Sequence, residues 1–116
     1  MQPETGKYLS DIHQSAQRIR AYVEGKTKQA YLSDVKPQDA IQWNFIVIGE
    51  ALSQLGKQDS ATAQQISEWH RIIAFRNQLI HGYGVINNEI TWEIIENKLA
   101  ALQRDVVELL SHEGSD

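Results

Sequence analysis

The stretch RIIAFRNQLIHGYGVINNE, residues 71–89, holds the side chains best suited to chemistry. Arg76 carries a permanently charged guanidinium, which can hold a phosphate or carboxylate by two parallel hydrogen bonds. His81 carries an imidazole that can donate or accept a proton near neutral pH. Asn77 precedes His81 by one helical turn, a spacing at which an amide can orient an imidazole ring. The stretch therefore predicts a polar site on a helix that also bears apolar residues.

Arg76 occupies an unusual place on this helix. At about 100° per residue, Arg76 falls near the centre of an apolar band. The other members of the band are Trp69, Ile72, Ile73, Ile80 and Tyr83. Arg76 and His81 point roughly 140° apart on an ideal helix, too far to meet at one atom. Either the arginine reaches around the helix, or a second copy places its own helix opposite and the copies share one cleft. Apolar surface on this helix and the preceding one favours the shared cleft.

Four long helices are predicted to position these residues. Periodicity and helix-ending signals place them at about residues 5–24, 37–56, 66–82 and 89–110. Residues 26–34 can add a short helical turn, and Asp34 or a neighbour can cap the helix that starts near Pro37. No alternating pattern is long enough to predict a strand. The expected class is all-α.

The second helix is apolar almost all round. Its main stripe consists of Ile41, Phe45, Ile48, Leu52 and Leu55, and Trp43, Ile46 and Val47 lie on other faces. Gly49 would permit another element to approach closely. Glu50 interrupts the apolar pattern, so it is either a partner for Arg76 or a solvated residue.

Composition limits the range of functions. A chain of 116 residues fits one domain, expected here over residues 1–116, and the absence of cysteine excludes disulfides and thiolate chemistry. The net charge of −4 argues against general coating of nucleic acid, although a local basic cleft is compatible with it. The N-terminal sequence has no secretory pattern, and the most apolar run, residues 45–52, is too short to span a bilayer. We therefore expect a cytoplasmic protein that does not enter the membrane.

The segment RNQLIHGY, residues 76–83, resembles the Arg-x-x-x-x-His-x-Tyr signature of the HepT-like branch of the HEPN superfamily. Arg76, His81 and Tyr83 occupy the matching positions, with no departure inside the signature. IGEAL at 48–52 and ITWEIIENKLAAL at 90–102 also resemble that family. The resemblance extends over nearly the whole chain.

This resemblance implies an up-and-down four-helix HEPN bundle that forms a homodimer, or a larger assembly, with two signatures facing one cleft. It implies a toxin that cleaves RNA, with tRNA among the candidate substrates, without a metal or another cofactor. It also implies a partner, a small nucleotidyltransferase antitoxin that neutralises the toxin by attaching AMP to Tyr83.

The implied chemistry is physically reasonable, because RNA carries its own nucleophile, the 2′-hydroxyl. Cleavage then needs a base, an acid and a cation beside the phosphate. His81 would be the base or the acid, Arg76 would hold the phosphate, and Asn77 would orient the imidazole. AMP on Tyr83 would add bulk and negative charge where the phosphate must bind.

Other interpretations stay open. Arg76 can be a structural arginine paired with a buried carboxylate, and His81 can interact with the helix dipole. The remaining histidines, His13, His70 and His112, lack the spacing of metal ligands. The main alternative function is a catalytically silent dimeric HEPN module that binds a nucleotide or a nucleotidyltransferase partner. A helical scaffold without a site is the weakest reading, because it must explain Arg76.

Overall fold

The computed structural model describes residues 2–82 and 86–113. These residues form helices and no β-strand, so the predicted all-α class is confirmed. The helices are α1 (Pro3–Val23), α2 (Lys28–Leu32), α3 (Val35–Gln58), α4 (Ser60–Ala63), α5 (Trp69–His81), α6 (Asn88–Asn97) and α7 (Leu99–Glu113).

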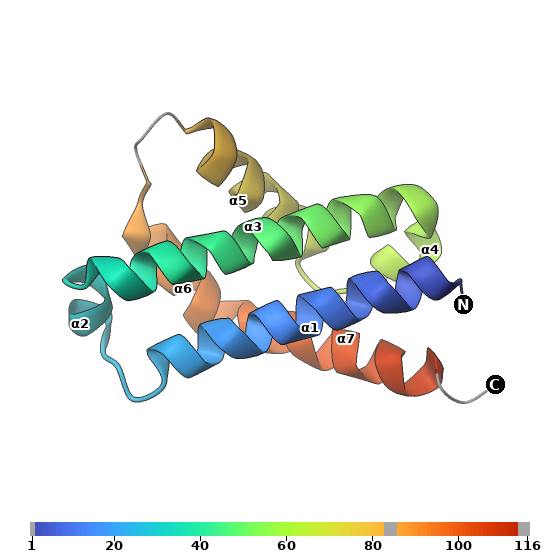
Figure 1. The fold of residues 1–116 in the computed structure, drawn as a ribbon, viewed down its shortest axis with the longest axis horizontal. Helices are drawn as coiled ribbons and strands as arrows, with labels where there is room; N and C mark the ends of the chain where they lie inside the picture. Colours follow the sequence, from blue (N-terminus) through green and yellow to red (C-terminus); the bar gives the residue numbers. More distant parts are fainter. Residues whose placement is uncertain (1, 83–85, 114–116) are drawn as a thin grey trace.

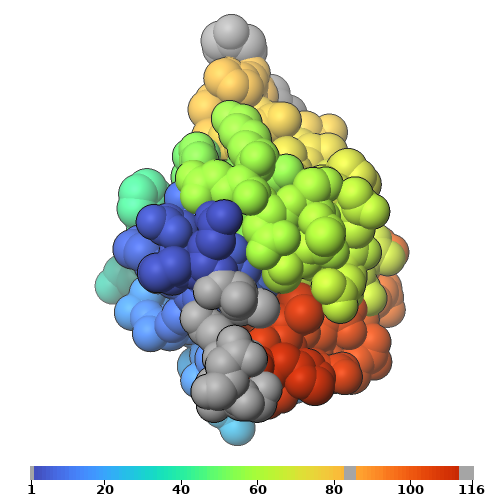
Figure 2. Space-filling view, turned by 90° about the vertical axis from the view of Figure 1, so that its right-hand side faces the viewer, coloured from blue at the N-terminus to red at the C-terminus, as the bar shows by residue number. Residues whose placement is uncertain are grey.

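The longer helices α1, α3, α5 and α7 alternate in direction along the chain, as in an up-and-down bundle (Figure 1). Helix α3 packs against α1 and also against α5, while α7 packs against α1. Figure 2 looks at the end of the bundle where α3 passes into α4, with the start of α1 and the end of α7 beside it. This arrangement makes α3 the common support of α1 and α5.

The core forms where the apolar stripes of these helices meet. The stripe predicted on the second helix is confirmed, because Ile41, Phe45, Ile48, Leu52 and Leu55 are all fully buried. Phe45 of α3 meets Phe75 of α5 edge to face, with ring centroids 5.2 Å apart. Such aromatic pairs stabilise a core by roughly 0.5–1.5 kcal/mol beyond the area they bury. The contact helps to fix the register of α5 on α3.

The start of the site helix differs from the prediction, because α5 begins at Trp69 rather than at Ile66. Helix α3 continues past Gly56 to Gln58, and a short helix, α4, follows it. Asp59 caps α4 by accepting hydrogen bonds from the backbone and hydroxyl of Thr62, which hold the pKa of Asp59 below its ordinary value. Glu68 then adopts a left-handed conformation (φ 67°), which interrupts the helical path before α5.

The predicted fourth helix is two helices, α6 and α7, which meet at an angle (Figure 1). Lys98 separates them with a φ of −128°, although its backbone N–H still bonds to the carbonyl of Ile94 at 2.9 Å. Its ammonium lies 3.7 Å from the carboxylate of Glu68, so the bend is tied to the segment before α5. The bend allows the apolar residues on both sides of it to reach the core: Ile94, Leu99, Leu102 and Val106 are buried.

Within residues 2–82 and 86–113, none of the helices combines the length and the apolar character needed to cross a bilayer.

Candidate active site

Arg76 lies across α3 at Gly49. A Cβ atom built on Gly49 would overlap the Cβ of Arg76 and would lie only 2.6 Å from its Cγ. Only glycine therefore allows the stem of Arg76 to lie in this position without displacement. The close approach predicted at Gly49 is confirmed, and the residue that makes it is the arginine of the signature.

A second glycine supports the same approach two turns later. A Cβ atom on Gly56 would lie 2.8 Å from Cζ3 of the Trp69 ring, at the start of α5. Gly49 and Gly56 are seven residues apart on α3, and their partners Arg76 and Trp69 are seven apart on α5. Two matched close contacts therefore hold α5 along α3. The sequence carries a signal for these contacts, two glycines at heptad spacing inside a helix, but Gly56 also fits a helix end, and the predicted end at Gly56 hides the signal.

The guanidinium of Arg76 pairs with Glu50, the residue after Gly49. Its Nη1 lies 3.3 Å from Oε2 of Glu50, and the Arg76 side chain is 15% exposed while that of Glu50 is 56% exposed. The Nε atom of Arg76 is buried with no hydrogen-bond partner, a state recorded for no other buried side-chain nitrogen or oxygen in the described residues. Both alternatives for Glu50 therefore hold at once: it pairs with Arg76 and it faces solvent.

The apolar band predicted around Arg76 is partly wrong. Phe75, which the band left out, is buried against α3, whereas Ile80, which it included, is 46% exposed. Ile72 is fully buried, as predicted. Arg76 consequently lies at the edge of the buried face of α5, where its stem packs on α3 and its head reaches Glu50.

His81 is the last residue of α5, and both His81 and Asn77 are exposed. No hydrogen bond between Asn77 and His81 is present in the described part of the chain, so the orienting role of Asn77 stays a prediction. Tyr83, the third signature residue, lies outside the described residues. The structure thus places Arg76 against α3 and leaves His81 open to solvent at the helix end. Within the described residues, no hydrogen bond or shared partner links the Arg76 and His81 side chains.

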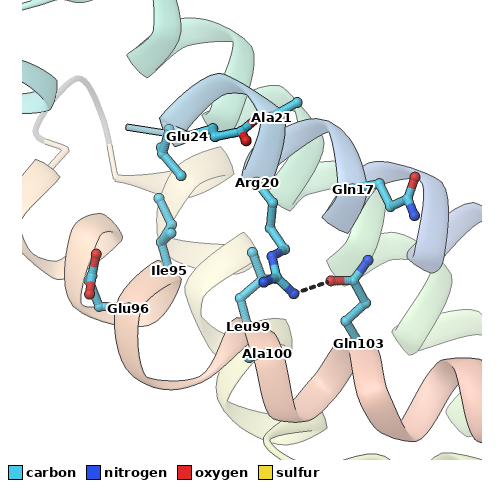
Figure 3. Close-up of a pocket in the computed structure, with 10 residues that line it drawn as sticks. Gln17, Arg20, Ala21, Glu24, Ile95, Glu96, Leu99, Ala100 and Gln103 are labelled. Atoms are coloured by element: carbon cyan, nitrogen blue, oxygen red, sulfur yellow. Dashed lines mark hydrogen bonds between the residues drawn. The ribbon is translucent and has the colours of Figure 1, made fainter. Parts of the chain in front are cut away.

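A groove of about 610 Å³ lies between α1 and the α6–α7 bend (Figure 3). Arg20 of α1 donates a hydrogen bond of 2.9 Å to Gln103 of α7 within it. The groove is lined by neither Arg76 nor His81. A smaller pocket of about 250 Å³ adjoins the end of α5, with Phe75, Leu79 and Gly82 in its wall. Concavity alone therefore does not identify the site.

Residues 2–82 and 86–113 contain no cluster of three or more histidine, aspartate or glutamate side chains that could hold a metal ion.

Comparison with known proteins identifies relatives along most of the chain. Residues 12–109 match the family described as Ribonuclease HepT-like. A protein of Methanocaldococcus jannaschii named "Putative RNase MJ0127" is 32% identical over 110 residues, which cover 94% of this chain and 90% of the relative. A protein of Caldanaerobacter subterraneus subsp. tengcongensis named "Putative RNase TTE0752" is 29% identical over 106 residues, covering 91% of this chain and 94% of the relative.

A third relative, named "Probable ribonuclease HepT" and found in Thermococcus cleftensis, is 24% identical over 96 residues. These residues cover 83% of this chain and 86% of that relative. No solved structure matches the chain.

Proposed function

Since the chain belongs to the HepT-like ribonuclease family, we propose that it is a metal-independent endoribonuclease in which Arg76 and His81 are the catalytic residues. The family relationship supports ribonuclease activity and an RNA substrate. The observation that carries the proposal is the placement of Arg76, whose stem lies over Gly49 and whose charged head is held at the protein surface by one exposed carboxylate. A guanidinium in that setting can donate its remaining N–H groups to a phosphate of RNA.

The proposed reaction uses the 2′-hydroxyl of RNA as its nucleophile. One imidazole removes the 2′-hydroxyl proton, the oxygen attacks the adjacent phosphorus, and the bond from phosphorus to the 5′-oxygen breaks. A proton donated to the 5′-oxygen completes the step, so the products are a 2′,3′-cyclic phosphate and a 5′-hydroxyl. His81 is the donor or the acceptor of these protons. Arg76 holds the phosphate and balances the charge that develops on it.

A homodimer would reconcile the separation of Arg76 and His81. Trp43 of α3 is 64% exposed and Ile80 of α5, the helix that carries Arg76, is 46% exposed. Large apolar side chains left open on a protein surface favour association. A two-fold axis near α5 would bring two copies of the signature to one cleft, so that Arg76 of one copy and His81 of the other could act on one phosphate.

The proposal includes a role as the toxin of a toxin–antitoxin pair, as the resemblance of the signature implies. Its antitoxin would be a nucleotidyltransferase that attaches AMP to Tyr83. Because Tyr83 follows His81 by two residues, the phosphate of the attached AMP would introduce negative charge beside the site and compete for Arg76. Neutralisation would then require no unfolding of the bundle.

A catalytically silent module that binds a nucleotide or a nucleotidyltransferase is the second candidate. The observation that favours it is that His81 is exposed and has no side-chain partner among the residues that the structure describes, whereas catalytic histidines are commonly oriented by a neighbouring group. Expression of the chain separates the two candidates. The ribonuclease proposal predicts arrested growth that His81→Ala relieves, whereas arrest that persists in His81→Ala supports the binding module.

The direct test of the reaction compares a synthetic RNA with the same sequence carrying one 2′-deoxy nucleotide at the cleaved position. Purified protein in excess EDTA should cut the RNA to 2′,3′-cyclic phosphate and 5′-hydroxyl ends, and it should leave the 2′-deoxy position intact. Cutting at the 2′-deoxy position would contradict the proposed nucleophile, and a requirement for added metal would contradict the proposed mechanism.

A further inference from the structure

Glu50 has a fixed place between two side chains of the α3–α5 face. Its Oε2 lies 3.3 Å from Nη1 of Arg76, and its Oε1 accepts a hydrogen bond of 3.2 Å from Nε2 of Gln54, one turn later on α3. Each carboxylate oxygen therefore has its own partner, which fixes the plane of the carboxylate. A carboxylate that only solvated this helix face would not need a defined orientation.

Arg76 has few alternatives to this partner. Its stem is confined by the backbone at Gly49, and its Nε is buried without an acceptor. Glu50 is its ion-pair partner within the described residues. The pair engages Nη1, and no hydrogen bond or ion pair of Nη2 is present within residues 2–82 and 86–113, so Nη2 can donate to an incoming anion.

We propose that Glu50 is a positioning residue for the phosphate-binding guanidinium of Arg76. Glu50 holds Nη1 so that the guanidinium keeps one orientation, and its negative charge screens Arg76 from anions until a phosphate binds. Glu50 thereby makes the site ordered but moderates its affinity for RNA. This inference rests on the proposed ribonuclease function for its kinetic consequences, but the ordering of Arg76 by Glu50 can be measured without RNA.

Two substitutions separate orientation from charge. Glu50→Gln keeps the side-chain length and an oxygen that can accept from Nη1, but it removes the negative charge. Glu50→Ala removes both. Because Glu50 is 56% exposed, neither change is expected to prevent folding. Glu108→Gln on α7 is the matched control, since it removes one charge from another exposed side chain, which is 70% exposed.

The first readout is the steady-state cleavage of one synthetic RNA by each dimeric variant. Glu50→Gln should lower KM by about two- to fivefold, the range expected for loss of one exposed ion pair, and leave kcat within about twofold. Glu50→Ala should lower kcat by roughly tenfold or more, since small displacements of a positioned group reduce the rate strongly. Glu108→Gln should match the wild type in both constants. A structural role alone would not produce this division between KM and kcat.

The second readout is the order of the Arg76 Nε–Hε group by ¹⁵N NMR relaxation, with Arg76→Lys used to assign the signal. The group should be rigid in the wild type and in Glu50→Gln, and mobile in Glu50→Ala. Equal order in Glu50→Ala and the wild type would overturn the inference, as would a kcat unchanged by Glu50→Ala. If the wild type cuts no RNA, the proposed function fails, and the NMR comparison still decides the positioning role of Glu50.

Discussion

Gly49→Ala is the substitution that tests most sharply how α3 sets the position of Arg76. The new Cβ would lie 2.6 Å from Cγ of Arg76, about 0.8 Å inside an ordinary contact distance of 3.4 Å. Because the two nearest atoms, Cβ and Cγ, belong to the base of the Arg76 side chain, rotation of its far end cannot relieve the overlap. Arg76 or the whole of α5 must therefore move away from α3.

The effect on stability should be modest, because two contributions oppose each other. Overpacking of this kind destabilises a fold by about 1–3 kcal/mol. Replacement of glycine by alanine within a helix stabilises it by roughly 0.5–1 kcal/mol. The free energy of unfolding should therefore fall by up to about 2.5 kcal/mol. The variant should remain folded in a protein of ordinary stability.

The effect on activity should be larger. A shift of about 1 Å in a catalytic group can cost about a hundredfold in rate, so Gly49→Ala should lower kcat/KM for RNA roughly 10- to 100-fold. The matched control is Gly56→Ala. Its new Cβ would lie 2.8 Å from Cζ3 of Trp69, so it crowds the same two helices without touching Arg76. It should lose comparable stability and keep activity within about threefold.

The assay pairs urea unfolding monitored by circular dichroism with RNA cleavage by each variant at equal protein concentration. Full activity in folded Gly49→Ala would refute the claim that the glycine contact positions Arg76. An equal loss of activity in Gly56→Ala would show that general loosening of α5, rather than displacement of Arg76, is responsible.

Three further outcomes are expected from the same structure. His81→Ala should abolish cleavage while the midpoint of thermal unfolding stays almost unchanged, because the residue is exposed at a helix end. The Thr62 hydrogen bonds hold the pKa of Asp59 low, so the stabilising contribution of Asp59 should be present above the ordinary pKa of about 3.9 and be lost as the pH falls below it. Asp59→Asn should lack this part of the acid dependence. The check is thermal unfolding of both proteins at pH values spaced by about one unit, from about pH 2.5 to about pH 6. Trp43→Gln should shift sedimentation toward the monomer, whereas Val107→Gln, which alters an exposed apolar residue on α7, should not.

The packing of the second helix could be predicted from its sequence, because one apolar stripe at helical spacing dominates it. The burial of Ile41, Ile48 and Leu55 follows directly from that period. The close approach at Gly49 was also predictable, since a glycine within an apolar helix suggests a contact with another backbone or side chain. Its partner was not, because the register of α5 on α3 depends on tertiary contacts such as the Phe45–Phe75 pair.

Other features could not be read from local sequence. The left-handed conformation of Glu68 delays the start of α5. Glutamate rarely adopts this conformation, so the residue type does not predict it. The bend at Lys98 interrupts an apolar pattern that continues on both sides, so periodicity alone predicts one helix. The pairing of Glu50 with Arg76 was one of two alternatives, since a charge on a helix does not reveal which neighbour faces it.

The most direct test of the ribonuclease assignment is cleavage of total RNA and tRNA by purified protein in excess EDTA, with Arg76→Ala and His81→Ala compared with the wild type. The oligomeric state and the circular dichroism spectrum of each variant are measured on the same preparations. We expect cutting by the wild type and loss of cutting in both folded variants. Absence of cutting by the wild type, or equal cutting by His81→Ala, would contradict the assignment.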